Sequence, residues 1–361
     1  MFQEIGGNFH LPPDDLIEKK GIQLEKKYID GEKDIAYTSS GRGAISLVLN
    51  QIACFKHRAL LPLYTCESVI LPFLKKGFDV SYYDCNMDLS VNENSFYKKL
   101  TTFDPDLVFI HTYFGFDTIY NIRPKYHELR KKVLIIEDIT HSLYSEFPKE
   151  GANYYIASLR KWFALPDGAV AISTEKKFYN SKSGIHEKLV KQNIEAIRLK
   201  YQYTKNLNVG VKEKFRELFY ASEDLLDRDC DFYSMSDISK TILSKVDEKG
   251  LYKSRRRNYL FLHKHILNNP QLIPVFKRLP DNVVPLYLPV YVNGDRSQLQ
   301  KYLAEREIYC PVHWPVPSEC KGEMTEKSKK IYNNILSIPC DQRYNLKDMK
   351  RIVSVLSKYA N

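Results

Sequence analysis

The most constraining feature of the sequence is a series of short, largely apolar runs between about residues 34 and 175, separated by longer amphipathic stretches. Runs of this kind suit strands that are buried on both faces of a mostly parallel sheet. The stretches between them, such as 68–77 with its closing glycine, have the pattern of helices. The alternation predicts an α/β fold, a three-layer αβα sandwich with its active site at the carboxyl ends of the strands. The predicted strands are 59–63, 79–83, 107–111, 133–138 and 169–173.

The remainder of the chain has a different pattern. A chain of 361 residues is long enough for two domains. Helices are predicted at 185–201, 250–268, 297–306 and 346–359, with a strand at 283–292. This pattern favours a smaller α+β domain joined through a long helix. We therefore predict an N-terminal arm over 1–30, a large domain over 31–248 and a small C-terminal domain over 249–361.

Composition narrows the classes of partner. The net charge of +10, from 54 Lys and Arg against 44 Asp and Glu, suits nucleic acid, an anionic membrane or a phosphorylated small molecule. The basic residues are spread along the chain, and no RNA-binding aromatic signature accompanies them, so we expect no nucleic-acid partner. The sequence has neither a long apolar run nor a signal-peptide pattern, which predicts a cytoplasmic protein without a membrane partner. Its 7 cysteines lack metal-binding spacing, which indicates reduced thiols and no metal site.

Two segments could bind a phosphorylated ring. The turn over 37–45 contains Gly41 and Gly43 before an apolar helix, and backbone N–H groups at a helix start bind phosphate well. An ordinary strand-to-helix turn is the alternative. Asp138 ends a buried run, where a protonated pyridine nitrogen would supply the cationic partner that a buried carboxylate needs. In return, the carboxylate would keep the ring protonated, which makes pyridoxal phosphate (PLP) an electron sink. Capping of the next helix is the alternative role for Asp138.

Two further segments could meet a substrate. Lys161 lies among apolar and aromatic residues, where burial would favour the uncharged amine that binds a cofactor covalently. Ser158 precedes it by three residues and could bond a phosphate beside the same amine. The segment 308–317 contains three prolines with aromatic neighbours and predicts a stiff loop that faces a substrate cleft. A packed surface loop is the alternative.

Taken in order, these segments resemble the DegT/DnrJ/EryC1/StrS family of sugar aminotransferases, within the fold-type I PLP enzymes, over about residues 34–358. Ser40-Gly41-Arg42-Gly43-Ala44 is similar to the family's Gly-Thr-Ala-Ala phosphate turn, and Glu137-Asp138-Ile139-Thr140-His141-Ser142 to its Glu-Asp-Ala-Ala-His strand end. The resemblance implies that Asp138 pairs with the pyridine nitrogen and that His141 lies beside the ring. It implies that Lys161 carries the cofactor.

The sequence departs from the family in two places. The gap between Ser158 and Lys161 is shorter than is common in the family, although other fold-type I aminotransferases share it. The family stacks an aromatic ring on PLP just after a Pro-x-x-Thr segment, and the matching segment here, 62–66, places Cys66 at that position. Tyr64 could instead face the ring, and the sequence leaves this choice open.

The resemblance also implies an assembly and a reaction. Tyr233-Ser234-Met235-Ser236 is similar to the stretch that meets the neighbouring subunit's cofactor phosphate, which implies a homodimer with composite sites and Ser234 as a phosphate contact. The implied reaction transfers an amino group from an amino acid such as glutamate to a nucleotide-linked keto sugar, in surface polysaccharide or related sugar biosynthesis. Arg343 could hold a carboxylate, or be a surface arginine. The region 184–230 has no clear counterpart in the family.

Two other functions remain open. A sugar dehydratase or other lyase would use the same constellation, although Lys161 argues against the dehydratases in which a histidine replaces the lysine. A non-catalytic, carbohydrate-binding descendant of the fold is the other alternative, because Cys66 and Arg42 are unusual for the family. The sequence does not identify the sugar or the position aminated.

Overall fold

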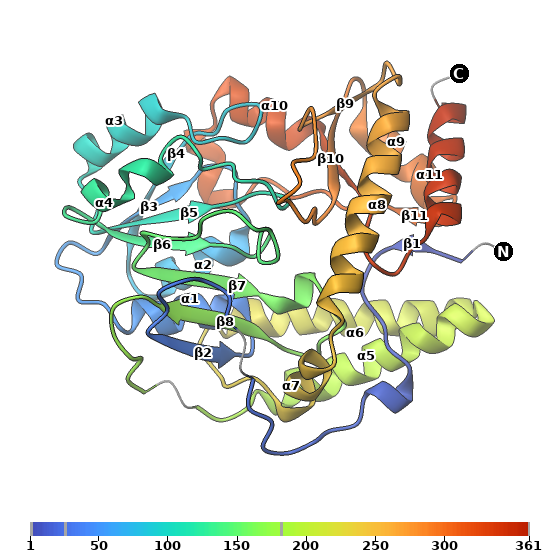
Figure 1. Ribbon diagram of the computed structural model, residues 1–361, viewed down its shortest axis with the longest axis horizontal. Helices are drawn as coiled ribbons and strands as arrows, with labels where there is room; N and C mark the ends of the chain where they lie inside the picture. The colour runs from blue at the N-terminus through green and yellow to red at the C-terminus, as the bar shows by residue number, and fades with distance from the viewer. Residues whose placement is uncertain (1–2, 25–26, 181–182, 360–361) are drawn as a thin grey trace.

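A computed structural model describes residues 3–24, 27–180 and 183–359. Its centre is a seven-stranded sheet with the strand order β2-β8-β7-β6-β5-β3-β4 (Figure 1). Only β8 runs antiparallel to its neighbours, so the sheet is mostly parallel, as predicted. The strands are β2 (Asp34–Thr38), β3 (Arg58–Pro62), β4 (Asp79–Tyr83), β5 (Leu107–His111), β6 (Leu134–Asp138), β7 (Tyr154–Ser158) and β8 (Ala169–Ser173).

Helices cover both faces of this sheet, and alternate strand residues belong to different cores. On one face Leu61 and Phe109 pack in a cluster with the helices α1 (Gly41–Leu49) and α2 (Glu67–Lys75). On the other face Leu60 and Val108 pack with α3 (Glu93–Phe103), α4 (Tyr126–Leu129) and α7 (Asp237–Ser244). Burial on both faces explains why the strands are continuous apolar runs. The predicted three-layer α/β fold is confirmed.

A smaller antiparallel sheet forms from the C-terminal part of the chain, in the order β12-β10-β9. It consists of β9 (Leu272–Pro274), β10 (Leu288–Val292) and β12 (Ile335–Ile338). The predicted strand 283–292 therefore begins only at Leu288. Residues 283–287 pass the loop after β5 instead, where Leu286 N–H donates to the Phe114 carbonyl at 3.0 Å. Pro285 has no N–H for a ladder bond, which is consistent with this break.

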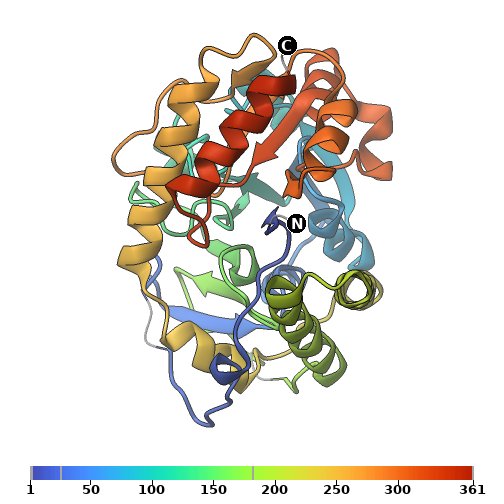
Figure 2. The same ribbon diagram turned by 90° about the vertical axis from the view of Figure 1, so that its right-hand side faces the viewer.

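Four helices pack around the smaller sheet. They are α8 (Glu248–Ile266), α9 (Arg296–Ala304), α10 (Glu326–Asn334) and α11 (Leu346–Tyr359). The short strand β1 (Ile5–Gly6) pairs in parallel with β11 (Ile308–Tyr309). Figure 2 shows the N-terminal segment crossing the molecule to reach this pair. Residues 1–2 and 25–26 of the predicted arm 1–30 lie outside the described residues.

The region without a family counterpart forms a helical hairpin. It consists of α5 (Glu187–Asn206) and α6 (Val209–Arg228), which pack along each other beside the sheet (Figure 1). One long helix was predicted here, and the second arises after Leu207 adopts a left-handed conformation and Asn208 caps the next helix. Short 3₁₀ helices complete the fold at η1 (Pro13–Asp15), η2 (Arg123–Lys125), η3 (Leu159–Lys161) and η4 (Ser318–Glu323).

The described ranges contain neither a helix suited to span a membrane nor a cluster of metal-ligating side chains. No helix within them has both the length and the apolar character that are needed to cross a membrane. Nor do these ranges contain three or more His, Cys, Asp or Glu side chains grouped so that they could hold a metal ion.

Candidate active site

The site is built on the carboxyl ends of two neighbouring strands. His111 ends β5, Asp138 ends β6, and the sheet register places them opposite each other. The buried Asp138 accepts a bond from the Thr140 N–H at 2.8 Å through Oδ1, while its Oδ2 lies 3.4 Å from His111 Nδ1. Burial lowers the pKa of His111, and Asp138 only partly opposes this shift. Asp138 is therefore a buried carboxylate with one oxygen directed at a neutral ring rather than at a cation.

Three aromatic rings line this strand edge. The Trp314 ring lies nearly parallel to the rings of His111 and His141, at 26° to each, with centroid distances of 5.8 and 5.4 Å. His141 Nδ1 accepts a bond from the Phe114 N–H at 3.3 Å, so a neutral His141 carries its proton on Nε2. Burial lowers the pKa of His141 well below its ordinary value, and the charges of His313, His111 and Lys161 add to this. Trp314 belongs to the proline-rich segment 308–317, which was predicted to face a cleft, and its ring lies at this site.

A phosphate cradle lies beside these rings. Ser40 caps α1 by accepting a bond from the Gly43 N–H at 3.0 Å, and the first N–H groups of a helix have no partner within the helix. A Cβ atom on Gly41 would lie 3.5 Å from the Ser158 Cβ, so the serine stands against the start of the helix. The N-terminus of α1 and the Ser158 hydroxyl can together hold a phosphate.

Most of the predicted residues line one small cavity of about 140 Å³. Its lining includes Gly41, Arg42, Cys66, Asp138, His141, Ser158 and Lys161 from the prediction, together with His111, Thr140, Arg160, Glu223 and Trp314. Both ring nitrogens of the buried His111 lack a hydrogen-bond partner. A carboxylate at a strand end, a phosphate cradle and an amine around one cavity fit the donor set that PLP requires.

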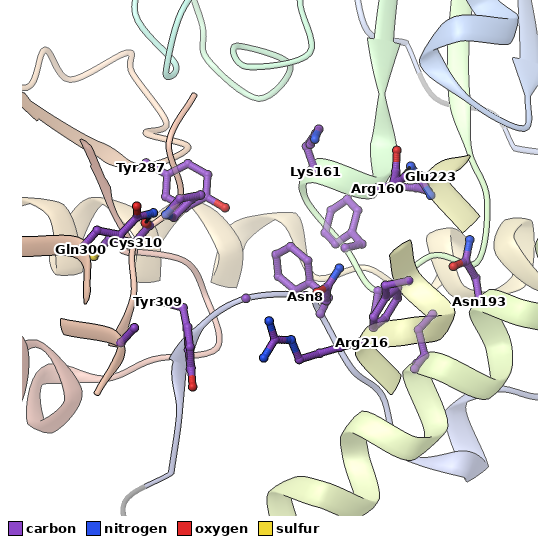
Figure 3. A pocket seen from close by; sticks show the side chains of 18 of the residues that line it. Asn8, Arg160, Lys161, Asn193, Arg216, Glu223, Tyr287, Gln300, Tyr309 and Cys310 are labelled. Atoms are coloured by element: carbon purple, nitrogen blue, oxygen red, sulfur yellow. Dashed lines mark hydrogen bonds and ion pairs between the residues drawn. The ribbon is translucent and has the colours of Figure 1, made fainter. Parts of the chain in front are cut away.

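Lys161 also borders a second, larger cavity of about 840 Å³. The two cavities share Arg160, Lys161 and Glu223. Figure 3 shows these residues on one side of the larger cavity, with Tyr287, Gln300, Tyr309 and Cys310 across from them and Asn8 and Arg216 between. The Lys161 side chain is exposed, so the expectation that apolar neighbours would bury it is wrong. The lysine stands where the two cavities meet.

Three predicted contacts lie outside the small cavity. A Cβ on Gly43 would meet the Asp231 carbonyl at 3.3 Å, so this glycine faces the chain before α7. Tyr64 is fully buried in the C-terminal core, with its ring centroid 5.0 Å from that of Tyr332, and Cys66 borders the cavity instead. The Ser234 hydroxyl accepts a bond from the Ser183 N–H at 3.1 Å.

Arg343 has an internal role. Its Nε and Nη2 donate to the two carboxylate oxygens of Asp341, at 2.8 and 2.9 Å. Its Nη1 also donates to the Asn8 carbonyl at 2.8 Å, which fixes the N-terminal segment along the larger cavity. The arginine does hold a carboxylate bidentately, but that carboxylate belongs to the same chain.

Sequence reasoning missed several lining residues. His111 could have been found, because it ends the strand next to the one that ends in Asp138. Arg160 adjoins the predicted lysine, and Trp314 lies in the predicted loop, but neither was singled out. Glu223 gave no local signal, because it is one of several acidic residues on α6.

Comparisons with known proteins agree with this geometry. No protein-family model matches the sequence. The dTDP-3-amino-3,6-dideoxy-alpha-D-galactopyranose transaminase of Aneurinibacillus thermoaerophilus is 26% identical over 163 residues, which are 42% of this chain and 41% of that protein. The match thus spans less than half of that relative's length.

Solved structures extend the likeness over the whole chain. PseC, a Helicobacter pylori aminotransferase in pseudoaminic acid biosynthesis, superposes with a TM-score of 0.71 at 13% identity, covering 99% of each chain. The chain has the fold of the sugar aminotransferases. Spr1654 of Streptococcus pneumoniae, solved in its PLP form, gives a TM-score of 0.69 at 12% identity over 99% of this chain and 98% of its own. The predicted resemblance to the sugar aminotransferases is confirmed.

Proposed function

We propose that this chain is a PLP-dependent aminotransferase that transfers an amino group from an amino acid such as glutamate to a nucleotide-linked keto sugar, in surface polysaccharide or related sugar biosynthesis. The observation that carries the proposal is the position of Lys161 between the small cavity and the larger one. An amine at that boundary can hold a cofactor on one side and reach a substrate on the other.

Several residues of the small cavity have a role in this proposal. When bound, PLP would supply an electron sink for negative charge at the amino carbon. Asp138 Oδ2 would accept the proton of the pyridine nitrogen, and the Nε2–H of His141 would be available as a donor. Ser158 and the start of α1 bind the phosphate. Lys161 Nζ would hold the cofactor and, as a free amine, would move a proton as general acid and base.

The larger cavity suits a small acidic substrate. Its volume of about 840 Å³ lies in the range of small-molecule sites. Arg216 of α6 and Lys301 of α9 bring positive charge to its lining, which would favour a donor carboxylate or a nucleotide phosphate. Tyr287 and Tyr309 add flat apolar surface with a polar tip, a combination that suits a sugar or a base.

The named relatives support the choice of substrate class. One is a transaminase named for a dTDP-linked amino sugar, and PseC acts in the biosynthesis of pseudoaminic acid. A keto sugar attached to a nucleotide would also suit a chain with a net charge of +10.

The proposal includes an assembly and a location. Ser234 lies in the segment whose family counterpart meets the cofactor phosphate of a neighbouring subunit. We therefore propose that the protein is a homodimer with composite active sites. We further propose that it acts in the cytoplasm. The division into an arm over 1–30, a large domain over 31–248 and a small domain over 249–361 is part of the same proposal. The seven-stranded sheet falls inside the second range and the three-stranded sheet inside the third.

A spectral experiment tests the function. The purified protein is incubated with PLP, and its absorbance is followed as single amino acids and then nucleotide-linked keto sugars are added. An amino donor should convert the bound cofactor to its aminated form, and the correct acceptor should reverse that change. A protein that takes up no PLP, or that takes it up but responds to no amino donor, would contradict the proposal.

A further inference from the structure

The hairpin helix α6 places a carboxylate next to the proposed phosphate cradle. Glu223 Oε1 accepts a bond from Arg160 Nη2 at 2.6 Å, and its Oε2 lies 3.3 Å from Arg42 Nη1. Arg42 also pairs with Asp227, one turn further along the helix. Arg42 follows Gly41 at the start of α1, and Arg160 lies two residues after Ser158, so the two arginines flank the cradle.

The two arginines are largely removed from solvent, whereas the carboxylate is not. The exposed side-chain fractions are 11% for Arg42 and 18% for Arg160, against 49% for Glu223. The Nε atoms of both arginines are buried without a hydrogen-bond partner. Each guanidinium therefore has donor capacity that the carboxylates of Glu223 and Asp227 do not use.

The charge of Glu223 is set by these neighbours. Partial desolvation disfavours its ionised form, but the Arg160, Arg42 and Lys161 charges outweigh this and lower the pKa of Glu223 to about 2. At neutral pH it is an anion held by two guanidiniums. A phosphoryl group, with a charge of about −1.5 to −2 at pH 7 and three acceptor oxygens, suits two arginines better than one carboxylate does.

The helix α6 is anchored on both sides of Glu223. Lys75 Nζ donates to the carbonyls of Asp227 and Arg228, at 2.7 Å each. Lys212, near the other end of the helix, bonds the Glu307 carboxylate at 2.7 Å and the Tyr309 hydroxyl at 2.6 Å. Rotation of the half-exposed Glu223 side chain, rather than movement of the helix, is the simple way to release the arginines.

We propose that Arg42 and Arg160 form an anion site for a phosphoryl group, and that Glu223 of α6 competes with that group for the two arginines. The phosphoryl group comes either from the cofactor or from the substrate nucleotide. The cofactor case rests on the proposed function, whereas the anion site itself does not. The hairpin α5–α6 would thereby tune how tightly phosphorylated ligands bind.

Glu223→Gln tests the competition, because glutamine keeps the shape and removes the charge. The dissociation constants of PLP and of pyridoxal, which lacks the phosphate, are measured by absorbance titration. The variant should bind PLP roughly five- to tenfold more tightly, the scale of one or two partly exposed ion pairs, with pyridoxal unchanged. Glu217→Gln is the matched control, since Glu217 is an exposed carboxylate on the same helix and lies outside both cavities.

Inorganic pyrophosphate separates the two sources of the phosphoryl group. If Glu223→Gln tightens pyrophosphate binding to the PLP-loaded protein and leaves PLP binding unchanged, the site serves the substrate rather than the cofactor. If the unaltered protein binds no PLP, the proposed function fails. The anion site is then tested by itself, through the change in melting temperature that inorganic phosphate causes. A larger phosphate-induced shift in Glu223→Gln than in Glu217→Gln supports the site.

Arg160→Gln provides the opposite perturbation and should weaken binding of the phosphorylated ligand relative to pyridoxal. The inference is overturned if Glu223→Gln weakens PLP binding, which would make Glu223 a positioning residue for the arginines. It is also overturned if PLP and pyridoxal binding tighten by the same factor, or if no phosphorylated probe responds to either substitution.

Discussion

Replacement of Asp138 by asparagine removes the negative charge at the end of β6 while it keeps the shape of the side chain. Asparagine can still accept the Thr140 N–H through its side-chain oxygen, the contact that Asp138 Oδ1 makes at 2.8 Å. Its amide NH₂ then replaces Oδ2, which lies 3.4 Å from His111 Nδ1. A donor would stand where the proposed cofactor nitrogen needs an acceptor, because that nitrogen carries a proton.

The expected loss follows from the bond that is removed. A hydrogen bond to a charged group contributes about 1.5–3 kcal/mol net, and Asp138 is buried, which favours the upper end. About 3 kcal/mol corresponds to roughly a 10²-fold slower amino transfer. The covalent link to Lys161 should persist, since it does not require the carboxylate. The protein should therefore retain the absorbance of the bound cofactor and transfer the amino group more slowly.

Stopped-flow absorbance of a single half-reaction measures this rate directly. The amino donor is mixed with PLP-loaded Asp138→Asn, and the decay of the cofactor band is compared with that of the unaltered protein. Asp14→Asn serves as the control, because Asp14 is exposed on η1, outside both cavities. A half-reaction as fast as in the unaltered protein would refute the reasoning and assign Asp138 a purely structural role.

Three further predictions concern the cofactor, the fold and the assembly. Lys161→Ala should abolish the covalent link while the protein stays folded; borohydride reduction and peptide mapping check this, and a pyridoxyl label on another lysine would contradict the assignment. Glu137→Ala should lower the free energy of unfolding, measured in urea, by about 3–5 kcal/mol, because Glu137 is fully buried and accepts two bonds from Arg123 at 3.1 Å each. A decrease of less than about 1 kcal/mol would mean that water reaches the arginine. Mixing Lys161→Ala with Ser234→Ala should restore activity if the sites are shared, and an active monomer by light scattering would exclude this. Ser236 is unsuitable for that test, because its hydroxyl bonds the buried Asp167 at 2.5 Å.

Local sequence patterns were sufficient to pick out several residues that line the small cavity. A strand buried on both faces must be apolar along most of its length, so the polar residues Glu137 and Asp138 at its carboxyl end are conspicuous, and Asp138 was identified as the residue that ends the strand. The order of turn, strand end and lysine along the chain then indicated a common cavity, and Gly41, Asp138, Ser158 and Lys161 do line one.

The tertiary structure alone decided which further side chains share that cavity. Tyr64 and Cys66 are two residues apart, but core packing buries the tyrosine ring and leaves the cysteine at the cavity. Trp314 reaches the His111 and His141 rings from far along the chain. The hairpin α5–α6 places Glu223 between two arginines that the sequence gives no reason to connect with it. Periodicity reports whether a residue faces inward within its own element, whereas contacts between distant elements depend on how those elements pack, and no local pattern encodes that.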